Sequence, residues 1–255
     1  MRDDVVFFTI AGDPVNLGYA QKMEKSFHHF HPDIRLEIFG EEEIKKANDP
    51  NIFYRATPLY GRILLEKYPL VIKIDADSVV TGKLDHIIDD KTYDVGCVLN
   101  WNRVDPPRYN FPLTVWDIPM QDYMNCGFVA MRSLPFVNQW WRLCLNPKFF
   151  NYRFREQDLL NIMYHYGDYS VKCFDHSNQW HGLVSKGEWL NFEKRGEEIF
   201  LPIVDKYPDA EKKIKVIHFA GGEIPDKMNF RKYFKGDVMQ YLIDLTEGYV
   251  KKESA

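Results

Sequence analysis

The 255-residue sequence has few cysteines, no long apolar run and no excess of basic residues. Cys97, Cys126, Cys144 and Cys173 show neither a Cys-x-x-Cys pair nor zinc-ligand spacing, which predicts reduced core thiols in a cytoplasmic protein. No apolar run is long enough to cross a bilayer, and residues 1–4 lead into an apolar stretch only as long as a strand, so no signal peptide is expected. The formal net charge of −4 argues against a nucleic-acid binder that depends on phosphate neutralisation.

The composition is that of a folded chain with a sizeable core. Apolar residues make up 45% of the sequence, which argues against wholesale disorder. There is no internal repeat, low-complexity tract or clear linker. We therefore expect one domain that spans residues 1–255, and no feature of the sequence indicates an oligomeric state.

Apolar, β-branched segments alternate along the chain with segments of helical periodicity. This alternation predicts an α/β fold, Rossmann-like, with a mixed, mostly parallel sheet flanked by helices. Strands are expected at 5–10, 34–39, 69–80, 93–99, 126–131 and 214–219, and helices at 17–27, 41–47, 57–67, 134–145, 156–166 and 238–249. The helix at 57–67 is expected to have Thr57 as its cap and Pro58 in its first turn.

Two carboxylates one residue apart, Asp75 and Asp77, end the apolar strand that begins near residue 69. Side chains two apart on a strand point the same way, and two like charges held together lose water at a cost unless a cation is near. Hard divalent metals take such oxygen ligands, often together with a substrate's phosphates. In parallel sheets ligands bind beyond the carboxyl ends of strands, where Asp13, these carboxylates and His218 are expected.

The acid pair has three interpretations. It can be a polar turn that arose by chance, because short motifs need structural context. It also resembles the nucleophile motif of haloacid-dehalogenase-like phosphatases, with Asp75 as nucleophile and Asp77 as acid/base. That family carries the motif on its first strand with a second acidic site downstream, and neither condition holds here. The third interpretation is the metal and diphosphate site of a nucleotide-sugar transferase.

Two stretches, 100–123 and 175–202, are irregular and rich in aromatic residues, among them Trp101, Trp180 and Trp189. Long irregular segments in a compact domain are often functional loops. Exposed aromatic faces suit the apolar C–H faces of sugar rings. The alternative is that these rings only pin the loops to the body of the protein, since tryptophan is highly buried on average.

Six short motifs in one order resemble glycosyltransferase family 8, the family of glycogenin and bacterial lipopolysaccharide galactosyltransferases. They resemble its nucleotide-gripping first turn, its Tyr-Ala-Arg element, its Asp-x-Asp segment, its Phe-Asn-Ser-Gly stretch, its Asp-Gln-Asp-x-x-Asn helix start and its closing His-Tyr-x-Gly. The match runs from about residue 5 to 222, and the motifs lie at 9–13, 60–62, 74–80, 124–128, 155–161 and 217–221.

The chain departs from that family at two places. The family follows its final motif with Lys-Pro-Trp, whereas residues 222–227 read Gly-Glu-Ile-Pro-Asp-Lys, so Lys227 or Arg231 is the candidate for the phosphate-binding cation. The family's first helix aspartate is Glu156 here, which lengthens one carboxylate beside the donor sugar.

The resemblance implies a GT-A fold and a metal-dependent hexosyltransferase that moves a sugar from a nucleoside diphosphate, UDP, to a carbohydrate or glycoconjugate hydroxyl with retention of configuration. Such acceptors are often lipid-linked, which leaves contact with a membrane surface open. The implied metal ligands, for Mn²⁺ or Mg²⁺, are Asp75, Asp77 and His218. The implied catalytic residues are Gln157, Asp158 and Arg62. The implied substrate-binding residues are Thr9, Ala11, Asp13, Arg62, Asp75, Ala76, Asn125, Glu156, Gly221 and Lys227.

Plainer roles remain open for several of these residues. A histidine at a strand end is commonly structural, Asp13 before a proline forms an ordinary turn, and acidic residues such as Glu156 suit the start of any helix. Two other functions also remain: a sugar-phosphate nucleotidyltransferase of related fold, although 11–17 lacks a basic glycine-rich loop, and a catalytically degenerate carbohydrate-binding protein.

Overall fold

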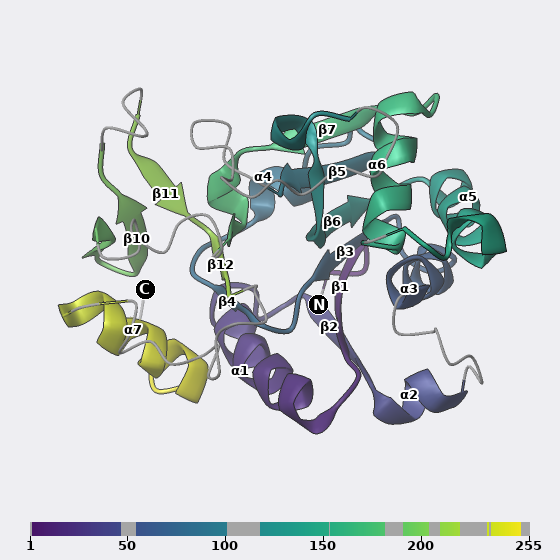
Figure 1. Ribbon diagram of the computed structural model, residues 1–255. Coiled ribbons are helices and arrows are strands. Elements are labelled where there is room, and N and C mark those ends of the chain that lie inside the picture. Colours follow the sequence, from purple (N-terminus) through teal and green to yellow (C-terminus); the bar gives the residue numbers. More distant parts are fainter. Residues whose placement is uncertain are drawn as a thin grey trace.

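The computed structural model describes residues 2–46, 55–100, 118–152, 154–181, 191–203, 210–219, 234 and 236–250. A six-stranded central sheet with helices on both faces forms its body (Figure 1). Strand β6 runs antiparallel to both of its neighbours, and the other pairs are parallel. The strand order is β2 (Arg35–Gly40), β1 (Val5–Ala11), β3 (Leu70–Ile74), β6 (Met124–Met131), β5 (Val95–Leu99) and β7 (Val171–Phe174).

The inner strands are apolar on both sides because helices cover both faces of the sheet. One face packs against α3 (Ala56–Leu65), α5 (Leu134–Leu145) and α6 (Glu156–Tyr166). The other packs against α1 (Pro14–Phe30) and the short α4 (Asp85–Ile88). The fold is therefore α/β with a mixed, mostly parallel sheet, as the sequence predicted.

Two three-stranded sheets extend the molecule. One has the order β4 (Ser78–Val80), β12 (Val216–His218) and β8 (Trp180–His181). The other consists of β11 (Lys212–Ile214), β10 (Glu198–Leu201) and β9 (Glu193–Arg195). Helix α7 (Gly236–Glu247) lies beside α1 and shares a core with these sheets (Figure 1). The remaining elements are α2 (Glu41–Lys46) and 3₁₀ turns at Met120–Asp122, Pro147–Phe149 and His176–Asn178.

The structure corrects three of the expected elements. The expected strand 69–80 is two strands, β3 and β4, which lie in different sheets and are joined by a turn at residues 75–77. Helix α3 begins at Ala56 with Arg55 as its cap residue, so Thr57 lies inside the helix instead of capping it. The expected strand 214–219 is two strands that meet at Lys215 and pair with different partners. Helices α5 and α6 have the expected bounds.

The aromatic stretches are described only in part. Residues 101–117 and 182–190, with Trp101 and Trp189, lie outside the described residues. Trp180 is fully buried and packs against Phe192, so it pins its segment to the body of the protein. Among the helices that the structure describes, none combines the length and the apolar character that a bilayer span requires.

Candidate functional site

The acid pair lies on the turn that joins β3 to β4. The backbone N–H of Asp75 donates to Gly127 O on β6 at 2.8 Å, which fixes the start of the turn. Strand β4 then pairs with β12, where Ser78 stands opposite His218, and Phe219 N donates to Asp77 O at 2.9 Å. This short ladder brings residue 218 beside residues 75 and 77.

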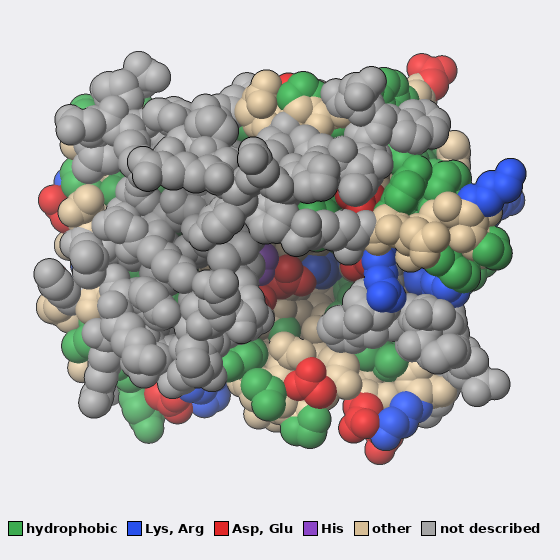
Figure 2. Space-filling model, viewed as in Figure 1, with side chains coloured by type: hydrophobic (Ala, Val, Ile, Leu, Met, Phe, Trp, Pro, Cys, Tyr) green, Lys and Arg blue, Asp and Glu red, His purple; other side chains and the backbone are tan. Residues whose placement is uncertain are grey.

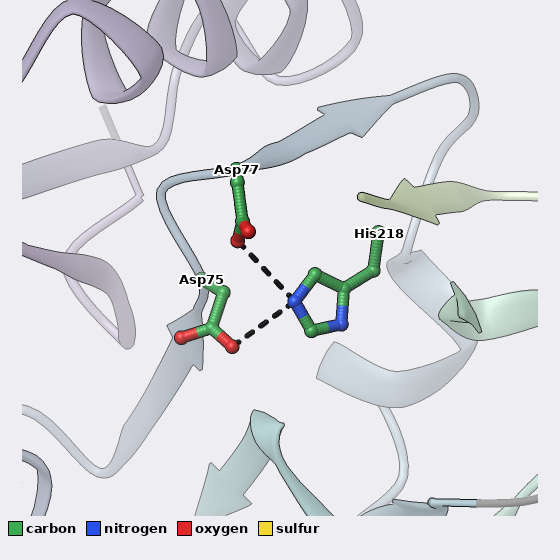
Figure 3. Close-up of side chains that lie close together, drawn as sticks. All are labelled: Asp75, Asp77 and His218. Carbon is green, nitrogen blue, oxygen red and sulfur yellow. Dashed lines mark ion pairs between the residues drawn. The ribbon is translucent and has the colours of Figure 1, made fainter. Parts of the chain in front are cut away.

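The three side chains converge (Figure 3). His218 Nε2 lies 3.2 Å from Asp75 Oδ2 and 3.3 Å from Asp77 Oδ1. One ligand atom from each residue lies within 4.8 Å of the others. The side chains of Asp75, Asp77 and His218 are 34%, 10% and 3% exposed, so the cluster is reached from the side of Asp75. The sequence predicted the convergence, although it placed both acids on the strand instead of on the turn beyond it.

The sequence interpretation missed the fourth charged group of the cluster, Lys73. Its Nζ forms an ion pair with Asp75 Oδ1 and donates to Cys126 O at 2.9 Å. Oδ1 of Asp75 therefore pairs with Lys73, and Oδ2 faces His218. A signal was available, because Lys73 is the single charged residue in an apolar strand and lies two positions before Asp75, on the same face.

The charges of the cluster stabilise one another. Burial would raise the pKa of Asp75, but Lys73 and His218 outweigh it, and that pKa lies well below its usual range. Burial would likewise lower the pKa of His218, but the charge of Asp77 and hydrogen bonds to both carboxylates raise it to about 9. Without a cation, the imidazole is therefore charged at neutral pH.

These residues fit a divalent cation. Two carboxylate oxygens and one imidazole nitrogen form a donor set that suits Mn²⁺ or Mg²⁺. A further observation is that Gly127 lies where a side chain would obstruct the cluster. A Cβ atom at this position would stand 2.5 Å from each of Asp75 Oδ2, Asn125 Oδ1 and Gln179 Nε2. Only glycine leaves these polar atoms room.

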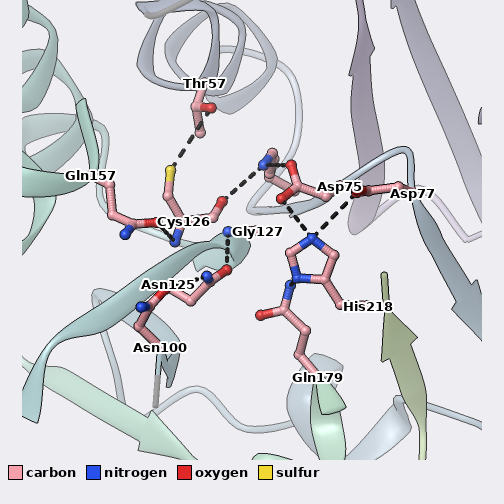
Figure 4. A network of polar contacts seen from close by, with 11 residues as sticks. Thr57, Asp75, Asp77, Asn100, Asn125, Cys126, Gly127, Gln157, Gln179 and His218 are labelled. Carbon is pink, nitrogen blue, oxygen red and sulfur yellow. Dashed lines mark hydrogen bonds and ion pairs between the residues drawn. The ribbon is translucent and has the colours of Figure 1, made fainter. Parts of the chain in front are cut away.

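A polar network continues from the cluster across β6 (Figure 4). Asn125 Oδ1 accepts the backbone N–H of Gly127 at 2.5 Å, and Asn125 Nδ2 donates to Asn100 Oδ1 at 2.6 Å. The predicted donor-sugar residue Asn125 thus lies next to the acid pair, with its amide held on both sides. Figure 2 shows histidine, acidic and basic side chains together in a recess near the middle of the same face as in Figure 1.

Two consecutive residues near the start of α6, Gln157 and Asp158, form hydrogen bonds that tie this helix to β6. Gln157 Oε1 accepts the backbone N–H of Cys126 at 2.8 Å. Asp158 is 1% exposed, and its carboxylate accepts from Tyr123 Oη at 2.6 Å and Phe154 N at 2.8 Å. Both oxygens of Asp158 are thus engaged within the protein, and they fix the start of α6 against β6.

Glu156, the first residue of α6, is half-buried beside the cluster. Burial raises the pKa of its carboxyl group to about 8, so it is mostly protonated at neutral pH and able to donate a hydrogen bond. It also lines a cavity of about 90 Å³ together with Arg55, Phe150 and Arg155. Arg155 has a φ of 48°, a left-handed conformation that is unfavourable for residues with a side chain.

The predicted nucleotide-binding residues lie at the carboxyl end of β1. Ala11 and Ala76 are buried together with Ala20, which brings the end of β1 against the acid-pair turn. Thr9 is fully buried, and its hydroxyl has no hydrogen-bond partner among the described residues. Asp13 is exposed and caps α1 by accepting the backbone N–H of Asn16 at 2.8 Å, so its carboxylate has a structural role.

Arg62 lies on α3, and its Nε is buried without a hydrogen-bond partner. Within the described part of the chain, no hydrogen bond or ion pair joins Arg62 to the acid pair. Gly221, Lys227 and Arg231 lie outside the described residues. Gln179, which the sequence interpretation did not single out, places its Nε2 2.9 Å from His218 Nδ1. It stands in a segment without regular spacing, so no sequence signal indicated it.

No protein-family model matches this sequence, and no curated protein matches it either. Solved structures do resemble it. The bifunctional glycosyltransferase WbbM has a TM-score of 0.60 at 15% identity over 96% of this chain, which spans 50% of the WbbM chain. An active-site mutant of LgtC has a TM-score of 0.59 at 15% identity, over 97% of this chain and 98% of the other.

A glycosyltransferase involved in glycosylation of the major capsid of PBCV-1 has a TM-score of 0.53 at 12% identity, over 86% of this chain and 94% of its own. LgtC is described as a galactosyltransferase and has also been solved with donor and acceptor sugar analogs. At these identities the likeness concerns the fold. The chain has the GT-A fold of these glycosyltransferases, with the Asp75, Asp77 and His218 cluster at the end of β3.

Proposed function

We propose that this protein is a metal-dependent glycosyltransferase of family 8 type, formed by a single domain, that transfers a hexose from a UDP-sugar to a hydroxyl of a carbohydrate or glycoconjugate. The observation that carries the proposal is the convergence of Asp75, Asp77 and His218 in a chain with a glycosyltransferase fold. His218 lies 141 positions after Asp77 in the sequence, yet the fold places its side chain against both aspartates. We keep a cytoplasmic location as a prediction.

In this proposal Asp75 Oδ2, Asp77 and His218 Nε2 hold Mn²⁺ or Mg²⁺. The bound cation would neutralise the negative charge that develops on the departing diphosphate. Lys73 holds the other oxygen of Asp75 and so fixes the direction in which that carboxylate faces. The end of β1, with Thr9 and its neighbours, would receive the nucleoside beside the acid-pair turn.

The sugar would lie against the start of α6 and the polar network on β6. Protonated Glu156 would donate a hydrogen bond to a sugar hydroxyl, and Asn125 would bind the same ring across Gly127. Gln157 would lie near the anomeric carbon. The hydrogen bond from Cys126 N to Gln157 Oε1 supports this placement, because it holds the amide against β6, the strand that carries Asn125 and Gly127.

The chemistry of Gln157 favours a front-face displacement. An amide carries no charge and is a poor nucleophile, so a covalent sugar–enzyme intermediate is disfavoured. Instead, the bond from the anomeric carbon to the diphosphate oxygen breaks, and the acceptor oxygen bonds to the same face of that carbon. The acceptor proton passes to the departing diphosphate, and the configuration is retained.

The test is UDP release from a panel of UDP-hexoses with Mn²⁺, with and without simple sugar acceptors. We expect turnover that a chelator removes and that Asp77→Asn and His218→Ala abolish. Asp89→Asn, an exposed aspartate that pairs with Arg2, is the matched control and should retain activity. Pyrophosphate formed from UTP and a sugar phosphate would instead indicate a nucleotidyltransferase, and an inverted product would contradict the front-face route.

A further inference from the structure

The imidazole of His218 has different neighbours at its two nitrogens. Nε2 faces Asp75 and Asp77, and Nδ1 faces the side-chain amide of Gln179 at 2.9 Å (Figure 4). Gln179 is 1% exposed. Its position follows from the parallel pairing of β8 with β12, in which Trp180 stands opposite Ile217. Backbone pairing thus places the amide beside the ring.

The amide of Gln179 has one end in use and one end without a partner. Nε2 points to the ring, and the carbonyl oxygen Oε1 is buried with no hydrogen-bond partner among the described residues. A buried carbonyl oxygen without a donor is unfavourable. The two ends of a primary amide have nearly the same shape, so a half-turn about the last side-chain bond exchanges them without other movement.

Cation binding determines which end of the amide must face the ring. A cation held by Nε2 of His218 uses the lone pair of that nitrogen, so the ring proton lies on Nδ1. In that state Nδ1–H needs an acceptor, and the NH₂ end of Gln179 cannot provide one. The carbonyl oxygen provides it after the half-turn, and this step gives the buried oxygen its missing donor.

We propose that Gln179 is a positioning residue of the cation site: its carbonyl oxygen accepts the Nδ1–H of His218 and so keeps Nε2 free to bind the cation. This inference rests on the cation site of the proposed function. Gln179 touches neither the cation nor the sugar in this arrangement. It acts through the tautomer and the orientation of His218, and histidine ligands in metal sites generally need such a partner.

Two substitutions separate this role from packing and from donation by the NH₂ end. Gln179→Met keeps the size and the neutral charge of the side chain but removes both polar ends. Gln179→Glu keeps the shape and an acceptor but removes the donor. We expect Gln179→Met to weaken Mn²⁺ binding by about 10–100-fold, and Gln179→Glu to bind at least as tightly as the wild type. Mn²⁺ affinity is measured by calorimetry on the full chain, with thermal unfolding as the check on folding.

The outcomes are distinct. Equal affinity in the wild type and Gln179→Met would mean packing only, and loss in both variants would mean that the NH₂ end is the one needed. Either result overturns the inference while the cation site stands. Absence of Mn²⁺ binding in the wild type overturns the inference and the metal dependence together.

A second measurement needs no variant. Long-range ¹H–¹⁵N spectra of the His218 ring in the wild type, recorded with saturating Mg²⁺, report which nitrogen carries the proton. We expect the proton on Nδ1, and a proton on Nε2 would overturn the inference.

Discussion

Gly127→Ala tests whether the free space at the centre of the polar network is needed for the site. The added Cβ would stand 2.5 Å from Asp75 Oδ2, Asn125 Oδ1 and Gln179 Nε2. Real Cβ atoms do not approach this closely, so these polar atoms or the backbone must move. Each of the three has a close polar neighbour. Asp75 Oδ2 and Gln179 Nε2 lie against the two ring nitrogens of His218, and Asn125 Oδ1 accepts from the backbone N–H of residue 127 itself.

The expected magnitude follows from this crowding. Overpacking of a tight interior costs about 1–3 kcal/mol, which lowers the unfolding midpoint by about 2–4 °C for each kcal/mol in a chain of this size. Metal–ligand distances tolerate only about 0.2 Å. Displacement of Asp75 Oδ2 should therefore weaken Mn²⁺ binding by about tenfold or more, an effect of the size seen when the partners of metal ligands are altered.

The assay is thermal unfolding of the Gly127→Ala protein with and without Mn²⁺, together with calorimetric Mn²⁺ affinity. Gly18→Ala is the matched control, because its added Cβ meets nothing within 4 Å and it lies inside α1, where alanine favours the helix by up to about 1 kcal/mol. A Gly127→Ala protein with wild-type stability and wild-type Mn²⁺ affinity would refute the argument.

Three further substitutions test the supports of the site. Lys73→Met removes one of the two charged partners of Asp75 and should lower the free energy of unfolding in urea by about 3 kcal/mol. This value is the low end for a broken buried ion pair, because a third of the Asp75 side chain is exposed. An unchanged free energy of unfolding would show that the ion pair contributes nothing to stability. Because the folded pKa of Glu156 is about 8, above its ordinary 4.5, the folded state binds more protons between these values and stability falls as pH rises. Glu156→Gln should flatten that decline in urea unfolding from pH 5 to 8, and parallel curves would contradict it. Asn161→Ala leaves the backbone N–H and C=O of Met124 without their side-chain partner and should lower the free energy of unfolding by about 2–4 kcal/mol. A loss below about 0.5 kcal/mol would mean that water replaces the Asn161 side chain as the hydrogen-bond partner.

The sequence located the acid pair and its distant histidine because these residues lie where the alternating pattern ends strands. The direction of β6 was not readable, since an apolar strand has the same local pattern whether its neighbours are parallel or antiparallel. The pairing of the chain across the sheet decides that direction. The structure shows that β6 is the strand that carries Asn125 and Gly127 to the end of β3.

The cap of α3 was wrong for a related reason. Proline is tolerated throughout the first turn of a helix, because backbone N–H groups there have no helical acceptor. Pro58 therefore fits a helix that begins at Ala56 as well as one that begins two residues later. The break at Lys215 likewise depends on partners remote in sequence: its N–H donates to Ser177 O, and its carbonyl accepts from Thr81 N.

The charges of the site change what the acid pair signifies. From the sequence alone, two carboxylates one residue apart predict a cation that offsets their repulsion. The structure provides two positive groups instead, Lys73 on Asp75 and the charged imidazole of His218 between both acids. The acid pair is thus already compensated, and its charge alone does not indicate a metal. The geometry does, because Nε2 and one oxygen of each aspartate point to a common position. A divalent cation would enter there only when His218 gives up its Nε2 proton, so cation binding at this site would release a proton.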